Sequence, residues 1–200
     1  PSLSFDARGH AGSDPTPVGR GSFPKRRADV RAALQEARRR GARRILGVGQ
    51  SQGAATLAMA LGQERAPDLA GLILDSGPAP DMGTAAWGLA GNMLGSHKGD
   101  RLARALLACR ILPGTEPLQY PFILWRALHR LRGVPLLWIH GDQDEVIERA
   151  WAAAWFHPLR PTGERWRALR VPGADHVRTL AVAPRLVEDA VGTFVAGLVS

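Results

Sequence analysis

The sequence is poor in cysteine and contains no long apolar segment. Its single cysteine, Cys109, excludes an internal disulfide, and no group of Cys and His residues has the spacing of a zinc site. No apolar run reaches the roughly 18 residues that a membrane-spanning helix needs. These absences exclude a disulfide-stapled secreted miniprotein and a zinc module, and they predict no transmembrane segment in the residues shown.

Length and composition are those of an ordinary globular domain. The chain has 200 residues, of which 45% are hydrophobic and 22% charged, so one domain with its own core is expected. Because the first residue is Pro1, we expect the sequence to be part of a longer protein, and any signal peptide would lie upstream. The cytoplasm is the compartment we favour, and no oligomeric state is indicated.

The formal net charge of +8 is concentrated in one segment. Nine basic residues lie between Lys25 and Arg44, and Lys25–Arg40 is predicted to be a helix with Val30 and Leu34 on its apolar face. We interpret it as a solvated helix whose basic end is favoured by the helix dipole. The alternative is an anion-binding or nucleic-acid-binding patch, but base-stacking aromatic residues are absent, which argues against nucleic acid.

Short apolar runs alternate with helical patterns along the chain. This alternation predicts an α/β fold with a mostly parallel sheet that helices cover on both faces. The predicted strands are Leu3–Ala7, Arg44–Gly49, Leu69–Ser76, Val134–Gly141 and Arg165–Gly173. The predicted helices besides Lys25–Arg40 are 52–63, Asp100–Ile111, Pro121–Leu131, 147–156 and one that begins at Pro184.

Residues 77–133 interrupt the alternation and are predicted to form a helical lid or cap. The core would then comprise residues 1–76 and 134–200. Cys109 lies in an apolar helical pattern, so we expect it to be buried and unreactive. The aromatic residues of this segment, which favour an apolar ligand beneath the lid, are Trp87, Tyr120, Phe122 and Trp125.

One pentapeptide has the pattern G-x-S-x-G, from Gly49 to Gly53, with Ser51 at its centre. It lies where a predicted buried strand passes into a helix, which is the context of a nucleophile elbow. A serine on such a tight turn stands clear of the sheet, and small residues at Gly49 and Gly53 allow the backbone to approach. Ser51 is therefore the candidate nucleophile.

A serine nucleophile needs a base that a carboxylate orients. Asp144 follows the strand that ends at Gly141, and His176 follows the strand that ends at Gly173. The carboxyl ends of parallel strands meet at one edge of a sheet, where ligands of α/β folds bind. Asp142 and Glu145 are alternative carboxylates, although we expect Asp142 to cap a turn.

The order Ser, Asp, His resembles that of the α/β-hydrolases. Five blocks are similar to that family in order: FDARGHAGS, GVGQSQGA, LAGLILDS, LLWIHGDQDEVI and VPGADH. The resemblance implies a carboxylesterase-like serine hydrolase of class EC 3.1 that cleaves an ester, thioester or related acyl bond of a small molecule without metal or organic cofactor. It implies that the Gln52 backbone N–H is one oxyanion donor. The family's first three strands and its second donor are missing from the chain, so we expect a weakened or inactive fragment.

Two other classes of function remain open. Gly47, Gly49 and Gly53 join a strand to a helix, and Asp75 ends the next strand, as in a dinucleotide-binding domain, although the spacing differs by one residue. That interpretation leaves Asp144 and His176 unexplained. The third possibility is a non-catalytic hydrolase-like module that binds partners or anions through the Lys25–Arg44 face.

Overall fold

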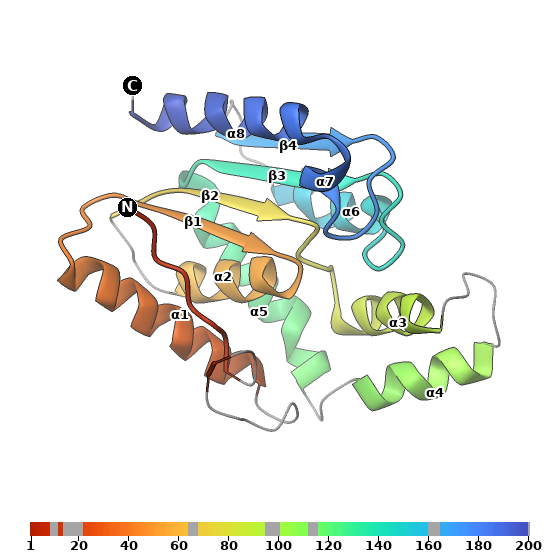
Figure 1. The fold of residues 1–200 in the computed structure, drawn as a ribbon. Helices are drawn as coiled ribbons and strands as arrows, with labels where there is room; N and C mark the ends of the chain where they lie inside the picture. The colour runs from red at the N-terminus through yellow and green to blue at the C-terminus, as the bar shows by residue number, and fades with distance from the viewer. Residues whose placement is uncertain are drawn as a thin grey trace.

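A four-stranded parallel sheet forms the centre of the molecule (Figure 1). The computed structural model describes residues 1–8, 12–13, 22–63, 68–94, 101–111, 116–159 and 165–199. The strands lie in the order β1-β2-β3-β4, and their bounds are β1 Ile45–Gln50, β2 Leu69–Asp75, β3 Leu136–Gly141 and β4 Trp166–Val171. The predicted parallel α/β sheet is confirmed.

Helices cover the sheet on both faces. Their bounds are α1 Ser22–Arg39, α2 Gln52–Gln63, α3 Met82–Met93, α4 Arg101–Ile111, α5 Glu116–Arg130, the short 3₁₀ helix η1 Leu131–Gly133, α6 Arg149–Leu159, α7 Thr179–Val182 and α8 Pro184–Val199. In Figure 1, α8 lies above the sheet, whereas α1, α2 and α5 lie below it. The expected helices are all present, and α3 and α7 are additional.

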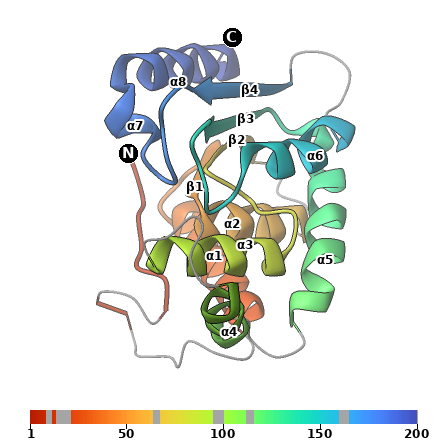
Figure 2. The same cartoon turned by 90° about the vertical axis from the view of Figure 1, so that its right-hand side faces the viewer.

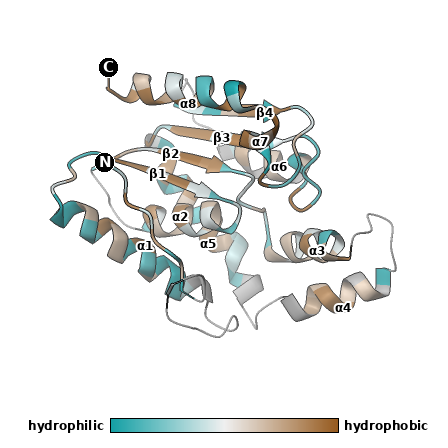
Figure 3. Ribbon diagram, viewed as in Figure 1, coloured by the Kyte–Doolittle hydropathy of each residue, from teal (hydrophilic) through white to brown (hydrophobic). Residues whose placement is uncertain are grey.

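The two faces of the sheet have separate cores, as the alternation of side chains along a strand requires. Leu72 and Leu74 of β2 pack into the core between the sheet and helices α1, α2, α5 and α6. Ile73 packs into the core between the sheet and α8. Figure 3 shows mostly hydrophobic strands and a largely hydrophilic α1. Within the first core, α2 and α5 approach closely because Gly62 lies against the Ala127 backbone, where a Cβ would clash.

The segment 77–133 divides into two structurally different parts. Helix α5 belongs to the main core, where Leu124 and Leu128 are buried. Helices α3 and α4 pack on each other and extend away from the sheet, as Figures 1 and 2 both show. Cys109 is exposed because α4 packs through its opposite side, so the prediction that it is buried is wrong.

The predicted strand Leu3–Ala7 is not formed. Residues 1–8 have no regular secondary structure, and Leu3 and Phe5 are exposed. No described strand pairs with the outer edge of β1, and an extended segment without a neighbouring strand cannot satisfy its backbone as a strand. Instead, Arg8 forms an ion pair with Asp29 of α1. Residues 9–11 of the FDARGHAGS block lie outside the described residues.

Candidate active site

Ser51 lies in a sharp turn between β1 and α2. Its φ angle of +51° is in the left-handed region, which residues other than glycine rarely adopt. Its backbone N–H donates to the Asp75 carbonyl at 2.8 Å, and its own carbonyl accepts from the Ala54 N–H at 3.0 Å. The turn is held from β2 on one side and by the first turn of α2 on the other.

The two glycines of the motif have different surroundings. A Cβ on Gly49 would lie 2.8 Å from the Gly53 carbonyl oxygen and 2.9 Å from Ala54, which is too close for any side chain. A Cβ on Gly53 would have no neighbour within 4 Å. The close approach predicted for both positions therefore occurs at Gly49 alone. Gly77, which the sequence did not single out, touches the elbow from the other side: its Cβ would lie 2.9 Å from the Ser51 carbonyl oxygen.

The structure brings the side chains of Ser51, His176 and Asp144 into one chain of hydrogen bonds. Ser51 Oγ lies 2.8 Å from His176 Nε2, and His176 Nδ1 lies 2.9 Å from Asp144 Oδ2. The Asp144 side chain is fully buried, whereas 14% of the His176 side chain is exposed. A carboxylate at Nδ1 favours the tautomer in which Nε2 can accept the serine proton.

Asp144 is held by its own loop. Its Oδ1 atom accepts the backbone N–H groups of Val146 at 3.0 Å and Ile147 at 2.8 Å. This leaves Oδ2 directed at His176. Asp142, the alternative carboxylate, instead bonds to the Arg170 guanidinium and to the Gly173 N–H, each at 2.7 Å.

The contacts of Asp142 stabilise its charged form and occupy both of its carboxylate oxygens, so this residue has a structural role. Arg170 and then the Gly173 N–H hold the pKa of the Asp142 carboxyl below its usual value. Asp142 therefore links the loop after β3 to the loop after β4 rather than capping its own turn. Glu145, the third carboxylate, is exposed.

His140 supports the same loop from the core. It is fully buried at the end of β3, and its Nε2 donates to the Ile147 carbonyl at 2.7 Å and lies 3.4 Å from Asp144 Oδ2. Burial lowers the pKa of His140, against smaller opposing contributions from the Ile147 carbonyl and Asp144. Its Nδ1 has no hydrogen-bond partner among the described residues. A neutral His140 therefore fits this place.

Gln52, the expected oxyanion donor, is the first residue of α2. The first N–H groups of a helix have no partner within it, and the helix dipole favours negative charge there. The Ser51 carbonyl, which shares a peptide unit with the Gln52 N–H, accepts the Ala54 N–H at 3.0 Å, so this peptide unit is held in place. A backbone N–H at the start of a helix is the kind of donor that oxyanion sites use.

Sequence reasoning missed a network beside the nucleophile. Asp75, which we had considered only as a ribose-binding acid, accepts hydrogen bonds from Gln50, Ser76 and Thr179. Ser76 in turn accepts the Val177 N–H at 3.1 Å. Partners 101 to 104 residues apart leave no local pattern in the sequence.

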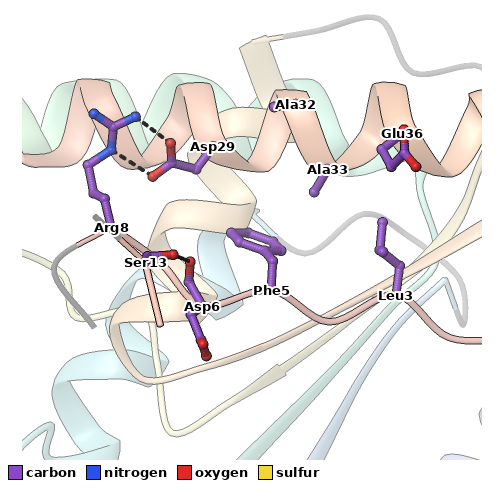
Figure 4. A pocket seen from close by; sticks show the side chains of 9 residues that line it. All are labelled: Leu3, Phe5, Asp6, Arg8, Ser13, Asp29, Ala32, Ala33 and Glu36. Atoms are coloured by element: carbon purple, nitrogen blue, oxygen red, sulfur yellow. Dashed lines mark hydrogen bonds and ion pairs between the residues drawn. The ribbon is translucent and has the colours of Figure 1, made fainter. Parts of the chain in front are cut away.

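Two cavities of the described residues can be compared with the site, and neither is lined by Ser51 or His176. One, of about 460 Å³, lies between α3 and the loop that carries Asp144. The other, of about 430 Å³, lies between the N-terminal segment and α1 (Figure 4), where Phe5 points toward Ala33 and Arg8 pairs with Asp29.

The basic helix α1 carries several ion pairs. Arg38 pairs with Asp68 at 2.7 Å, and Arg39 and Arg40 both bond to Glu36, whose pKa is lowered to about 2 by these two arginines. Part of its charge is thus neutralised locally, which weakens the anion-binding alternative.

Metal ligands and membrane spans were sought in the part of the chain that the structure describes. It contains no group of three or more potential metal ligands. None of its helices combines the length and the apolar character needed to span a membrane.

Comparison with known proteins gives likenesses in structure only. No family model and no curated protein sequence matches the chain. An esterase of Pyrococcus furiosus superposes with a TM-score of 0.72 at 19% identity, over 98% of this chain and 69% of that chain. A thermophilic esterase of Thermogutta terrifontis superposes with a TM-score of 0.61 at 18% identity, over 96% of this chain and 78% of that chain.

A carboxylesterase of the ammonia-oxidizing thaumarchaeon Nitrososphaera gargenis is similar to a comparable degree. Its TM-score is 0.63 at 16% identity, over 97% of this chain and 79% of that chain. At such identities the likeness concerns the fold. The parallel sheet, the strand-to-helix turn at Ser51 and these superpositions together show that the chain has the α/β-hydrolase fold.

Proposed function

We propose that this chain is a serine hydrolase that cleaves an ester, thioester or related acyl bond through an acyl-serine intermediate. The observation that carries the proposal is the hydrogen-bonded chain Ser51–His176–Asp144 at the carboxyl edge of the sheet. The esterase neighbours support the same class of reaction.

The first half of the reaction is acylation. His176 Nε2 accepts the Ser51 Oγ proton while Oγ attacks the substrate carbonyl carbon, and a tetrahedral oxyanion forms. The Gln52 N–H donates to that oxyanion. Asp144 stabilises the imidazolium. The carbonyl then reforms, the bond to the leaving oxygen or sulfur breaks, and that atom takes the proton from His176.

The second half is hydrolysis of the acyl-enzyme. His176 removes a proton from water, and the resulting oxygen attacks the acyl carbon. The second tetrahedral intermediate breaks its bond to Ser51 Oγ, which regains a proton from His176. The products are a carboxylic acid and the free serine, and no metal or organic cofactor takes part. Because Asp144 is buried and held by two backbone N–H groups, it needs no rearrangement in either half.

We assign the helical insertion two roles. Helices α3 and α4 would act as the lid, because they project from the sheet and pack on each other through Ala86, Ala90 and Ala108. Helix α5 would serve as part of the core. Of the aromatic residues expected to favour an apolar substrate, Trp87 lies on α3 and packs against the contact between α3 and α4, whereas the others lie on α5. Tyr120 is buried and donates to the Ala79 carbonyl, and Phe122 and Trp125 are exposed.

The dinucleotide-binding alternative is disfavoured by two observations. Asp75 is engaged by Gln50, Ser76 and Thr179, so its carboxylate is not free for a ribose. The four described strands also follow their chain order, without the reversal next to β1 at which dinucleotides bind. The proposed hydrolase accounts for Ser51, Asp144 and His176 together.

The proposal is tested by turnover of p-nitrophenyl acetate and a short-chain thioester. With an activated ester, for which deacylation is the slower half, we expect a burst of product followed by slower turnover as the acyl-enzyme accumulates. Ser51→Ala should abolish the burst, and Ser13→Ala, which removes an exposed hydroxyl from the N-terminal segment, should retain it. A Ser51→Ala variant as active as the parent would refute the proposal, as would folded protein that shows neither slow turnover nor covalent labelling of Ser51 by a fluorophosphonate.

A further inference from the structure

Three described residues other than glycine have positive φ angles, and all three lie around the candidate site. Ser51, Ser76 and Val177 have φ angles of 51°, 51° and 54°. They belong to three different segments: the elbow, the end of β2 and the loop that carries His176. Such conformations persist only where surrounding contacts hold them, and a β-branched valine resists them most.

Asp75 and Ser76 supply contacts of this kind. Asp75 Oδ2 accepts the Gln50 side-chain N–H at 2.8 Å and the Thr179 hydroxyl at 2.9 Å, and its Oδ1 accepts the Ser76 hydroxyl at 3.0 Å. The Ser76 oxygen then accepts the N–H of Val177, the residue after His176, at 3.1 Å.

Asp75 also holds the nucleophile. The Asp75 carbonyl accepts the Ser51 N–H at 2.8 Å, and Gln50, directly before Ser51, binds the Asp75 carboxylate. Ser76 is itself fixed, because its N–H donates to the Ile139 carbonyl of β3 at 2.9 Å. Ser76 and Thr179 are fully buried, so water does not replace a bond that is lost there.

We propose that Asp75, Ser76 and Thr179 form a clamp that sets the position of His176 relative to Ser51. None of the three touches the reacting atoms, so they are positioning residues. The clamp joins the elbow to the histidine loop through the end of β2, and Asp144 fixes the imidazole from the opposite side. The inference rests on the proposed function, since it explains how the 2.8 Å contact between Ser51 Oγ and His176 Nε2 is maintained.

The test compares rates at which a fluorophosphonate labels Ser51. Thr179→Val removes the hydroxyl at nearly constant volume, and Ser76→Ala removes the acceptor of the Val177 N–H. We expect each to slow labelling by about ten- to a hundredfold, because displacement of a catalytic group by about 1 Å has that effect. Thr179→Ser restores the hydroxyl and should restore most of the rate.

The control is Ser13→Ala. Ser13 likewise donates its hydroxyl within the chain, to the Asp6 carbonyl at 2.6 Å, but it lies in the N-terminal segment and not at the candidate site. We expect it to leave the labelling rate of folded protein unchanged. The low-field proton signal of His176 Nδ1–H, observed by NMR, should shift in Thr179→Val and stay in place in Ser13→Ala.

The outcomes separate this inference from the proposed function. If the parent chain labels at Ser51 and the folded Thr179→Val and Ser76→Ala variants label at the parent rate with an unchanged His176 signal, the clamp is refuted and the hydrolase proposal stands. If the folded parent chain does not label at all, the proposed function itself fails. Slower labelling that Thr179→Ser rescues supports the clamp.

Discussion

The carboxyl edge of the sheet and the outer face of α1 both carry chains of polar contacts, but several groups at the sheet edge are fully buried, whereas the arginines on α1 are exposed. At the sheet edge, Ser76, His140 and Thr179 are fully buried. At the C-terminal end of α1, the side chains of Arg39 and of the next residue, Arg40, are 72% and 62% exposed although both bind Glu36. A buried group that loses its partner bears the full cost of desolvation, whereas water replaces an exposed one. We therefore expect the loss of a buried polar contact to cost more stability or activity than the loss of an exposed one.

The largest effect on turnover is expected from substitution of one of two neighbouring carboxylates, Asp144 and Asp142. Asp144→Asn should lower kcat by about 10⁴-fold, because an amide in its place favours the wrong tautomer of His176. Asp142→Asn removes a carboxylate that binds Arg170 and Gly173 instead, so the folded variant should keep most of its turnover. Steady-state ester hydrolysis measures both, and equal losses would contradict the assignment of the acid.

The two glycines of the elbow allow the same substitution in different surroundings. Gly49→Ala forces a methyl group against the Gly53 carbonyl and Ala54, and should destabilise the fold by about 1–3 kcal/mol. Gly53→Ala meets open space in a helix and should be neutral or stabilise by up to about 1 kcal/mol. Thermal unfolding distinguishes them. A stable Gly49→Ala variant would show that the elbow is looser than described.

His140 should make stability depend on pH. Burial lowers its pKa in the folded state below the ordinary 6.5, so the unfolded chain binds this proton first as the pH falls. Stability should be constant above about pH 6.5 and decrease below it, by at most about 1.4 kcal/mol per pH unit. Thermal unfolding between pH 5 and 8 measures the slope.

Two variants test whether His140 causes the dependence of stability on pH. His140→Gln should flatten the dependence between pH 5 and 6.5, whereas His129→Gln, at an exposed position on α5, should leave it in place. Stability that rises toward pH 5 in the parent chain would contradict a neutral buried His140. Protonation would add an N–H at Nδ1, where no described acceptor lies.

The smallest effect, on thermal stability, is expected from a substitution on α1. Glu36→Gln removes the carboxylate that binds Arg39 and Arg40, all at the surface, and should leave the melting temperature within error of the parent. Differential scanning fluorimetry at low salt is the appropriate measurement, since salt screens exposed pairs. A large loss would mean that exposure does not distinguish the two regions.

Much of the sheet could be predicted because its signals are local. The apolar runs at Leu69–Asp75 and Leu136–Gly141 and the turn at Ser51 are visible in short stretches of sequence. Parallel strands then place Asp144 and His176 at the same edge as Ser51, and the structure brings these three side chains together. Their catalytic roles stay a prediction.

What could not be predicted depends on neighbours in space. Leu3–Ala7 has the pattern of a strand, but no described strand lies beside it. Cys109 has apolar neighbours in sequence, yet α4 packs through its other side. The contact between Ser76 and Val177 spans 101 residues and involves a backbone conformation that has no sequence signature.

Intact mass after treatment with a fluorophosphonate tests the central claim most directly, because it reports an activated serine without knowledge of the substrate. The parent chain, Ser51→Ala and His176→Ala are compared after circular dichroism has shown that each is folded. The proposed mechanism predicts one adduct on the parent, mapped to Ser51, and none on either variant. A folded parent chain that stays unlabelled, or an equal adduct on Ser51→Ala, would contradict it.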